Sequence, residues 1–185
     1  MPRKLTRDQI VDYATWTDVR LQQQPAIFAA KKLRRIFVGE YLTFLFENSE
    51  TVRYQVQEMM RIEKIVREKD IAHEIETYNE LIGGTGELGC ALLIEIDDEA
   101  TRDELLTAWL GLERTLYLQL DDGSRATARF DERQVGETRL SSVQYLTFDT
   151  GGRTPVAVGV DHPAYTDHTV LTDAQRDALA RDLAS

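Results

Sequence analysis

The sequence predicts an α+β protein in which a mostly antiparallel sheet packs against helices. Helix-like spacing of apolar residues dominates the first half of the 185 residues, and short strand-like segments dominate the second half. The two kinds of segment do not alternate regularly, as they would in a parallel sheet. A chain of this length can bury one core, so we expect a single domain over residues 1–185. A weak hinge is expected at residues 83–86, where the sequence is Gly-Gly-Thr-Gly.

The N-terminal segments have the spacing of helices followed by a hairpin. Residues 6–13 begin with a capping box and predict a short helix. A second helix, which Thr15 or Thr17 can cap, runs to residue 33, and Pro25 either kinks it or marks its first turn. Apolar residues then alternate over residues 36–46 around a central Gly-Glu pair, which predicts a β-hairpin.

The strongest helical pattern covers residues 50–69, directly after Ser49. One side of this helix carries a narrow apolar stripe made of Val52, Val56, Met59 and Val66. Glu63 lies in the middle of the stripe. We expect this helix to flank the sheet, and a further helix to follow over residues 71–81.

The second half of the chain supplies most of the strands. A buried strand is expected over residues 88–96, and a helix capped by Asp97 or Asp98 should reach Leu110. Further strands are expected near residues 115–120, 125–130, 143–148, 156–160 and 168–171. A last helix begins with the capping-box spacing at Thr172.

Composition excludes several classes of protein. The formal net charge of −10 argues against nucleic-acid binding, which needs basic residues to neutralise phosphates. The longest apolar stretches are too short to span a bilayer, and no signal peptide is recognisable, so we expect no membrane association. A single cysteine, Cys90, cannot form an internal disulfide and fits a reducing compartment, so we expect a cytoplasmic protein.

Common catalytic motifs are missing from the sequence. The Gly-Gly-Thr-Gly segment follows a helix and precedes a strand, the reverse of the order in a phosphate-binding loop. The sequence also lacks the usual hydrolase and zinc motifs. Whether the chain is an enzyme is therefore left open.

Glu63 and His162 are the candidate metal ligands. A carboxylate in an apolar stripe must be paired, neutral or coordinated, so Glu63 either forms a salt bridge, for instance with Arg34 or Arg35, or binds a divalent metal or polar ligand. His162 precedes a proline at a strand end, which holds its imidazole in place to coordinate a metal or transfer a proton. The alternative is a turn in which His162 bonds a neighbouring carbonyl group. We expect Glu63 and His162 to meet where the helix packs on the sheet.

Three further residues are candidates for binding a small polar ligand. Glu58 and Arg61 are neighbours on the helix, and Tyr54 lies one turn before Glu58. The alternative is that they form an ordinary ion pair within the helix. Tyr165 closes the segment Asp-His-Pro-Ala-Tyr and is the third candidate.

Several of these segments resemble an uncharacterised bacterial family named only as domain of unknown function 3501. The resemblance rests on Phe46-Glu47-Asn48, on residues 54–59 and 61–63, and on the segment at residues 161–165. The chain departs from the family pattern at Gly83 and Ala30, where relatives often have proline and histidine. The resemblance implies a partner such as a rubrerythrin-like or iron–sulfur redox protein, and a link to oxidative stress or iron metabolism.

Two functions remain as hypotheses. The first is an accessory protein that binds a metal or a small polar ligand between the long helix and the sheet. The second is a docking module without a site of its own, which would bind a redox partner through its basic helix end or its acidic C-terminal half.

Overall fold

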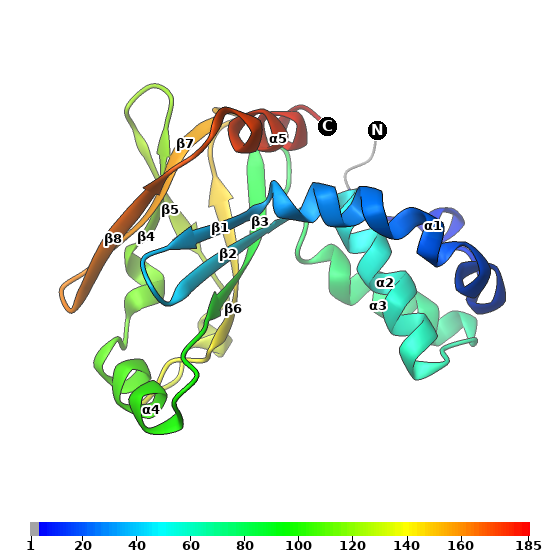
Figure 1. The fold of residues 1–185 in the computed structure, drawn as a ribbon, viewed down its shortest axis with the longest axis horizontal. Coiled ribbons are helices and arrows are strands. Elements are labelled where there is room, and N and C mark those ends of the chain that lie inside the picture. Colours follow the sequence, from blue (N-terminus) through cyan, green and yellow to red (C-terminus); the bar gives the residue numbers. More distant parts are fainter. Residues whose placement is uncertain (1–3) are drawn as a thin grey trace.

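The computed structural model describes residues 4–185 and shows two parts side by side (Figure 1). One part is a group of helices formed by the N-terminal half of the chain. The other is a strongly curled sheet, with the remaining helices at its ends. This arrangement confirms the predicted α+β class and the antiparallel sheet.

The helical part contains three helices and a short 3-10 turn. Their bounds are η1 (Arg7–Gln9), α1 (Tyr13–Lys32), α2 (Ser49–Glu63) and α3 (Glu68–Asn79). Helix α2 packs against both α1 and α3. Two small hydrophobic clusters hold them together, one centred on Val52, Val56 and Met60 and the other on Trp16, Ile27 and Tyr54.

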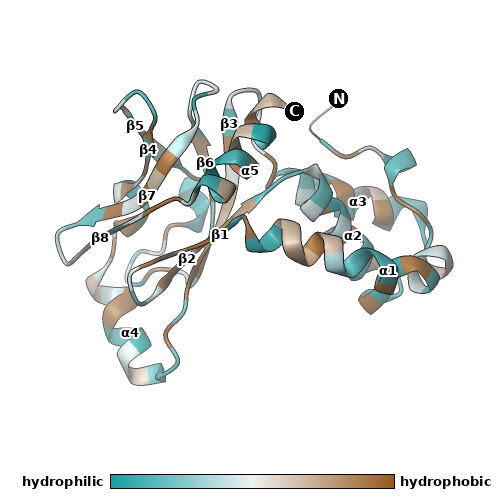
Figure 2. Cartoon of the chain, turned by 45° about the horizontal axis from the view of Figure 1, so that its top comes forward, coloured by the Kyte–Doolittle hydropathy of each residue, from teal (hydrophilic) through white to brown (hydrophobic). Residues whose placement is uncertain are grey.

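All eight strands join one sheet in which every neighbouring pair is antiparallel. The strands are β1 (Arg35–Val38), β2 (Leu42–Glu47), β3 (Glu87–Ile94), β4 (Leu116–Leu120), β5 (Arg125–Arg129), β6 (Val143–Asp149), β7 (Pro155–His162) and β8 (Tyr165–Val170). Their order across the sheet is β1-β2-β3-β6-β5-β4-β7-β8. In Figure 2, most of the length of β1 and β2 is hydrophobic.

The sheet curls until its two edge strands, β1 and β8, lie beside each other. Side chains of β8 bridge this gap to the backbone of β1. The Thr169 hydroxyl donates to the carbonyl oxygen of Phe37 at 2.6 Å, and the Tyr165 hydroxyl accepts from the amide of Glu40 at 3.2 Å. Gly39 is needed at this point, because it has φ +62° and a Cβ atom there would lie 2.0 Å from the Tyr165 oxygen.

The remaining helices close the ends of the curled sheet. They are α4 (Glu99–Ala108), the 3-10 turns η2 (Leu112–Thr115) and η3 (Glu132–Gln134), and α5 (Asp173–Ala184). Helix α5 contacts both β3 and β7, which are separated in the sheet by β6, β5 and β4. A single helix can touch both strands because the sheet curls around its large hydrophobic core.

A buried ion pair joins the two parts. The guanidinium of Arg34, between α1 and β1, donates to the carboxylate of Asp182 in α5 at 2.7 and 2.8 Å. Asn48, which caps the start of α2, donates to the same carboxylate at 2.9 Å. Both charged side chains are less than a tenth exposed. The geometry is bidentate, so one interaction fixes α1, α2 and α5 together.

The first helices differ from the sequence-based expectation. Residues 6–13 form only the short turn η1, and α1 begins at Tyr13 with Asp12 as its cap. The Asp12 carboxylate accepts from two backbone amides, a stronger signal than the later threonines. Helix α1 also continues through Pro25 to Lys32 instead of starting there.

The long helix is shorter than predicted. Val52 and Val56 of the expected stripe are buried, and Met60 takes the place expected for Met59. The helix ends at Glu63, because Lys64 has the left-handed backbone φ of 54° that terminates helices. Val66 lies beyond it and is 68% exposed. The buried face includes Met60, which is fully buried, whereas Met59 is only half-buried. Helix α2 packs on α1 and α3 instead of flanking the sheet.

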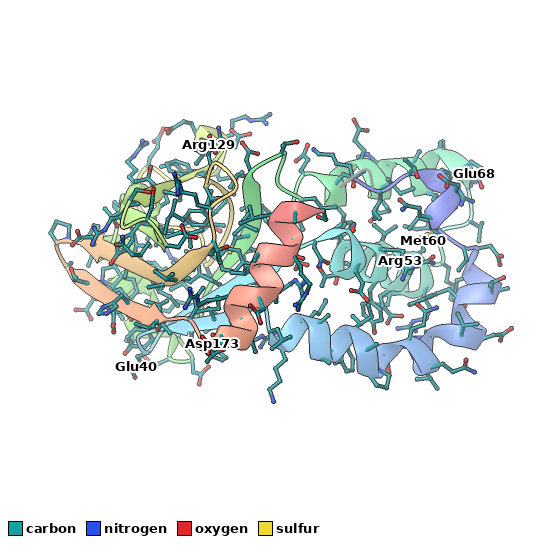
Figure 3. All side chains as sticks on the ribbon, turned by 90° about the horizontal axis from the view of Figure 1, so that it is seen from above. Glu40, Arg53, Met60, Glu68, Arg129 and Asp173 are labelled. Carbon is teal, nitrogen blue, oxygen red and sulfur yellow. The ribbon has the colours of Figure 1, made fainter. Side chains whose placement is uncertain are left out.

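Figure 3 shows Arg53 and Met60 in the helical part, well away from Glu40 and Asp173 in the sheet part. Helix α5, which begins at Asp173, lies on the side of the sheet part that faces the helices in this view. Among residues 4–185, no helix combines the length and apolar character that crossing a membrane requires.

The two neighbouring methionines of α2 test which face of the helix is buried. We expect Met60→Ala to lower the free energy of unfolding by about 2–5 kcal/mol, because it leaves a cavity in the helical cluster. Met59→Ala should cost less than about 1 kcal/mol. Urea titration of both variants measures the difference. A larger loss for Met59→Ala would show that the other face packs inward.

Candidate ligand site between α1 and α2

The carboxylate of Glu58 is the centre of the contact between α1 and α2. Trp16 donates its indole N–H to Oε1 at 2.8 Å, and Arg20 donates to both oxygens at 2.9 Å. Arg61, one turn further along α2, donates to both oxygens at 3.3 and 3.1 Å. The Glu58 residue is only 9% exposed. Its charge is therefore fully compensated by side chains of two helices.

This network lowers the pKa of Glu58 to about 2. The largest cause is the hydrogen bonding of Arg20, and Arg61 and Trp16 act in the same direction against the opposing effect of burial. The carboxylate therefore stays ionised at neutral pH. Two arginines surround a single carboxylate, so the cluster keeps an excess of positive charge.

Aromatic packing continues the same interface. The Tyr54 ring meets Trp16 edge-on with ring centres 5.7 Å apart, and Phe28 in the same manner at 6.2 Å. Gln24 donates to the Tyr54 hydroxyl at 3.1 Å. These contacts fix the Trp16 ring, whose N–H is held by Glu58, in one orientation.

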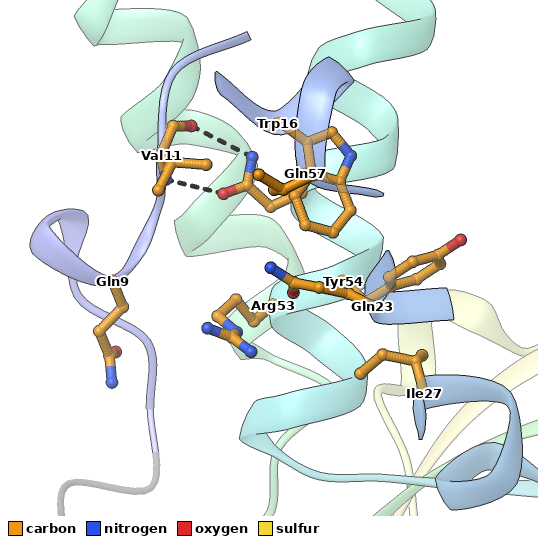
Figure 4. A pocket seen from close by; sticks show the side chains of 9 residues that line it. Gln9, Val11, Trp16, Gln23, Ile27, Arg53, Tyr54 and Gln57 are labelled. Atoms are coloured by element: carbon orange, nitrogen blue, oxygen red, sulfur yellow. Dashed lines mark hydrogen bonds between the residues drawn. The ribbon is translucent and has the colours of Figure 1, made fainter. Parts of the chain in front are cut away.

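The N-terminal segment is tied across α2 by a single amide side chain. Gln57 accepts from the backbone amide of Val11 at 2.7 Å and donates to its carbonyl group at 3.1 Å. Figure 4 shows both bonds as dashed lines. The segment before α1 is thereby held over the space between α1 and α2.

A cavity of about 50 Å³ lies between the N-terminal segment, α1 and α2. Most of its lining is hydrophobic. The hydrophobic wall consists of Val11, Trp16, Val19, Ile27 and Tyr54. Because these side chains come from three separate segments, the cavity exists only when α1 and the N-terminal segment are docked on α2.

The polar lining consists of Gln9, Gln23, Arg53 and Gln57. Arg53 is the only charged residue among the described residues that line the cavity. The side chains of Arg53 and Gln23 have no hydrogen-bonded or ion-paired partner in the described part of the chain. Figure 4 shows their side chains next to each other, Arg53 from α2 and Gln23 from α1. The cavity thus combines an apolar wall with a cation and an amide free to bind a ligand.

The predicted ligand residues Glu58 and Arg61 form the expected ion pair on α2. The structure shows them supporting Trp16 and Arg20, and neither lines the cavity. Glu58 and Arg61 would therefore affect a ligand only indirectly, because Glu58 holds the Trp16 side chain that lines the cavity.

Tyr165 and His162 pair across the turn between β7 and β8, far from α2. His162 accepts from the amide of Ala164 at 3.2 Å through Nδ1, and its Nε2 lies 3.2 Å from the carbonyl oxygen of Leu110. Tyr165 stacks on Trp109 with ring centres 4.6 Å apart. This geometry matches the alternative interpretation of His162 as a residue that holds a turn.

Glu63 lies exposed at the end of α2. The structure does not bring it to His162, because α2 packs between α1 and α3 while His162 belongs to the opposite part of the molecule. Arg34 is not its partner, because Arg34 pairs with Asp182. None of the ion pairs among residues 4–185 joins Glu63 to Arg35 either. Within residues 4–185, no three His, Cys, Asp or Glu side chains are grouped so that they could hold a metal ion.

The carboxylate of Glu113 is buried outside the α1–α2 interface. Both oxygens of Glu113, in η2, are buried without a hydrogen-bond partner among residues 4–185. This turn contacts β5 and β7, so Glu113 belongs to the sheet part and takes no part in the α1–α2 cavity.

The sequence interpretation missed Arg53, Gln23 and Trp16. A signal for them exists, because Trp16, Arg20, Gln23 and Ile27 recur at helical spacing and share one side of α1. That periodicity identifies a face of the helix. It does not identify α2 as the element that the face meets.

Comparison of the sequence with known protein families identifies the family of the chain. A family described as "Protein of unknown function (DUF3501)" matches residues 4–183. The chain belongs to the DUF3501 family. None of the curated protein sequences matches it.

A solved structure shares the fold of this DUF3501 chain. It is described as the crystal structure of a novel protein of unknown function from Burkholderia pseudomallei K96243. The two chains are 31% identical, the match covers 97% of this chain and 99% of the other, and the TM-score is 0.86. The curled sheet and the helical part of the DUF3501 chain are therefore both present in a solved relative.

The charge of Glu58 can be tested by substitution and by pH. Its pKa falls from the usual 4.5 to about 2, and each pKa unit corresponds to about 1.4 kcal/mol, so we expect Glu58→Gln to cost roughly 3 kcal/mol at pH 7. The stabilisation is complete above pH 4.5 and is lost as the pH falls towards 2. Urea titration at several pH values should therefore show the difference between wild type and variant shrinking over this range.

Glu63→Gln is the matched control, because Glu63 is exposed on the same helix. It should change the free energy of unfolding by no more than about 0.5 kcal/mol. Equal losses for the two variants would contradict the assigned role of Glu58.

Proposed function

We propose that this chain is a cytoplasmic accessory protein that binds a small polar ligand in the cavity between α1 and α2. The observation that carries the proposal is Arg53, an arginine that lines a partly open, mainly apolar cavity and whose side chain has no partner among residues 4–185. Surface arginines without partners are common, but an arginine beside a hydrophobic wall combines the apolar surface and the polar anchor that ligand sites use. The neighbouring Gln23 amide adds a second group free to bind.

The rigidity of the cavity wall supports the same proposal. Trp16 is held by Glu58 through its N–H and by Tyr54 through its ring. A wall that is fixed before the ligand arrives loses little conformational entropy on binding. Glu58 and Arg61, proposed from the sequence as ligand residues, would then act by positioning this wall.

The metal role of Glu63 and His162 is not part of this proposal, because the two residues lie in different parts of the fold. The cytoplasmic location is proposed from the single cysteine, Cys90, which is buried and fits a reducing compartment. The redox partners implied by the family resemblance remain predictions.

Filling the cavity tests the proposal. Val19 lines the cavity and is half-buried, whereas Leu21 lies on the same helix and is 67% exposed. Two small probes, butyrate and butanamide, fit the apolar wall and differ in charge. We expect one or both to raise the melting temperature of the wild type and of Leu21→Phe, and to have no effect on Val19→Phe.

The expected size of the shift follows from binding linkage. A probe at about 50 mM with a dissociation constant of about 1 mM adds roughly 2 kcal/mol, which corresponds to about 5 °C for a chain of this size. Melting curves are measured at matched ionic strength. The proposal fails if neither probe shifts the wild type, or if Val19→Phe responds as the wild type does.

A further inference from the structure

We infer that the α1–α2 cavity recognises a carboxylate carried on a short aliphatic chain, with Arg53 binding the carboxylate. This inference rests on the proposed function and names the class of ligand that the same site takes. Three features of the cavity lead to it: its charge, the shape of its polar groups and its volume. The surroundings of the cavity set the expected affinity.

The charge of the cavity favours an anion. Among residues 4–185, Arg53 is the only charged residue in its lining, and no acidic residue lines it. The nearby cluster of Arg20, Arg61 and Glu58 adds a further excess of positive charge. The lining of the cavity therefore carries a positive charge in a chain whose formal net charge is −10.

The shape of the polar groups favours a carboxylate. A guanidinium presents paired N–H donors in a plane, which match the two oxygens of a carboxylate. The Gln23 amide, from the opposite helix, offers another donor beside Arg53. The anion would therefore bridge α1 and α2 at the edge of the cavity.

The volume limits the size of the ligand. One water molecule occupies roughly 10–15 Å³ of such a cavity, so about 50 Å³ has room for roughly three to five water-sized groups. That is the length of a short aliphatic chain. The wall that would surround it contains Val19, Ile27 and Trp16, none of which needs a polar partner from the ligand.

The surroundings set the strength of binding. A second and more open hollow of about 430 Å³ also touches Arg53 and contains Asp8 and Glu50. Neither carboxylate forms an ion pair with Arg53, but both weaken its attraction for an anion. We therefore expect millimolar affinity that falls as salt is added.

The test compares butyrate with its neutral isostere, butanamide, and with inorganic phosphate. Affinities are measured by calorimetry for the wild type and for Arg53→Gln and Arg53→Lys. Arg35→Gln is the matched control, because Arg35 is an exposed arginine without a partner in the described residues and lies outside the cavity. The melting temperatures of the free variants show whether each one is folded.

We expect the wild type to bind butyrate about tenfold or more tightly than butanamide, since hydrogen bonds to charged groups are the stronger ones. Arg53→Gln should lose that preference by weakening butyrate alone. Arg53→Lys should recover only part of it, because a lysine keeps the charge and lacks the planar pair of donors. Arg35→Gln should behave as the wild type.

Other outcomes separate the inference from the proposed function. Equal binding of butyrate and butanamide, or butyrate binding that Arg53→Gln leaves unchanged, would overturn the carboxylate inference while the ligand site stands. Tighter binding of phosphate than of butyrate would also overturn it. Failure of both butyrate and butanamide to bind would overturn the inference and the proposed function together, whatever phosphate does.

Discussion

The buried charge of Glu58 is the constraint on which the helical part depends. A carboxylate that is 9% exposed needs donors from its surroundings, and Trp16 and Arg20 of α1 supply three of its five hydrogen bonds. Only one rotation of α1 places both residues against α2. That rotation also turns Ile27 towards α2 and brings the Trp16 ring to the cavity. The interaction that stabilises the helix pair therefore also shapes the ligand site.

The route of the chain explains how the two parts are joined. It leaves α1, forms the β1–β2 hairpin in the sheet, and returns to the helical part as α2. The chain thus passes between the two parts twice, both times next to the Arg34–Asp182 ion pair. The Asp182 carboxylate also accepts a hydrogen bond from the cap residue Asn48. The hairpin anchors the helices to the large core of the sheet. The sheet is thus a support for the proposed site, and its own polar residues His162 and Tyr165 hold turns.

Local spacing predicted the features that local interactions determine. The β1–β2 hairpin and the pairing of Glu58 with Arg61 follow from residues close in sequence. The antiparallel sheet joins segments far apart in the chain, and it was predicted from the order of helices and strands along the whole sequence. The buried face of α2 was misassigned to Met59, because one residue turns a helix by about 100°. The meeting of Glu63 with His162 and the existence of the cavity depend on which helix meets which element. No spacing within a single element contains that information.

The indole N–H resonances offer the most direct measurement of the central claim. The chain has two tryptophans, and they report on different parts: Trp16 on the cavity and Trp109 on the sheet. In a ¹⁵N-correlated spectrum titrated with butyrate, the account predicts a saturable shift of the Trp16 indole signal and a Trp109 signal that does not move. A Trp16 signal that stays in place, or a saturable shift confined to Trp109, would contradict it.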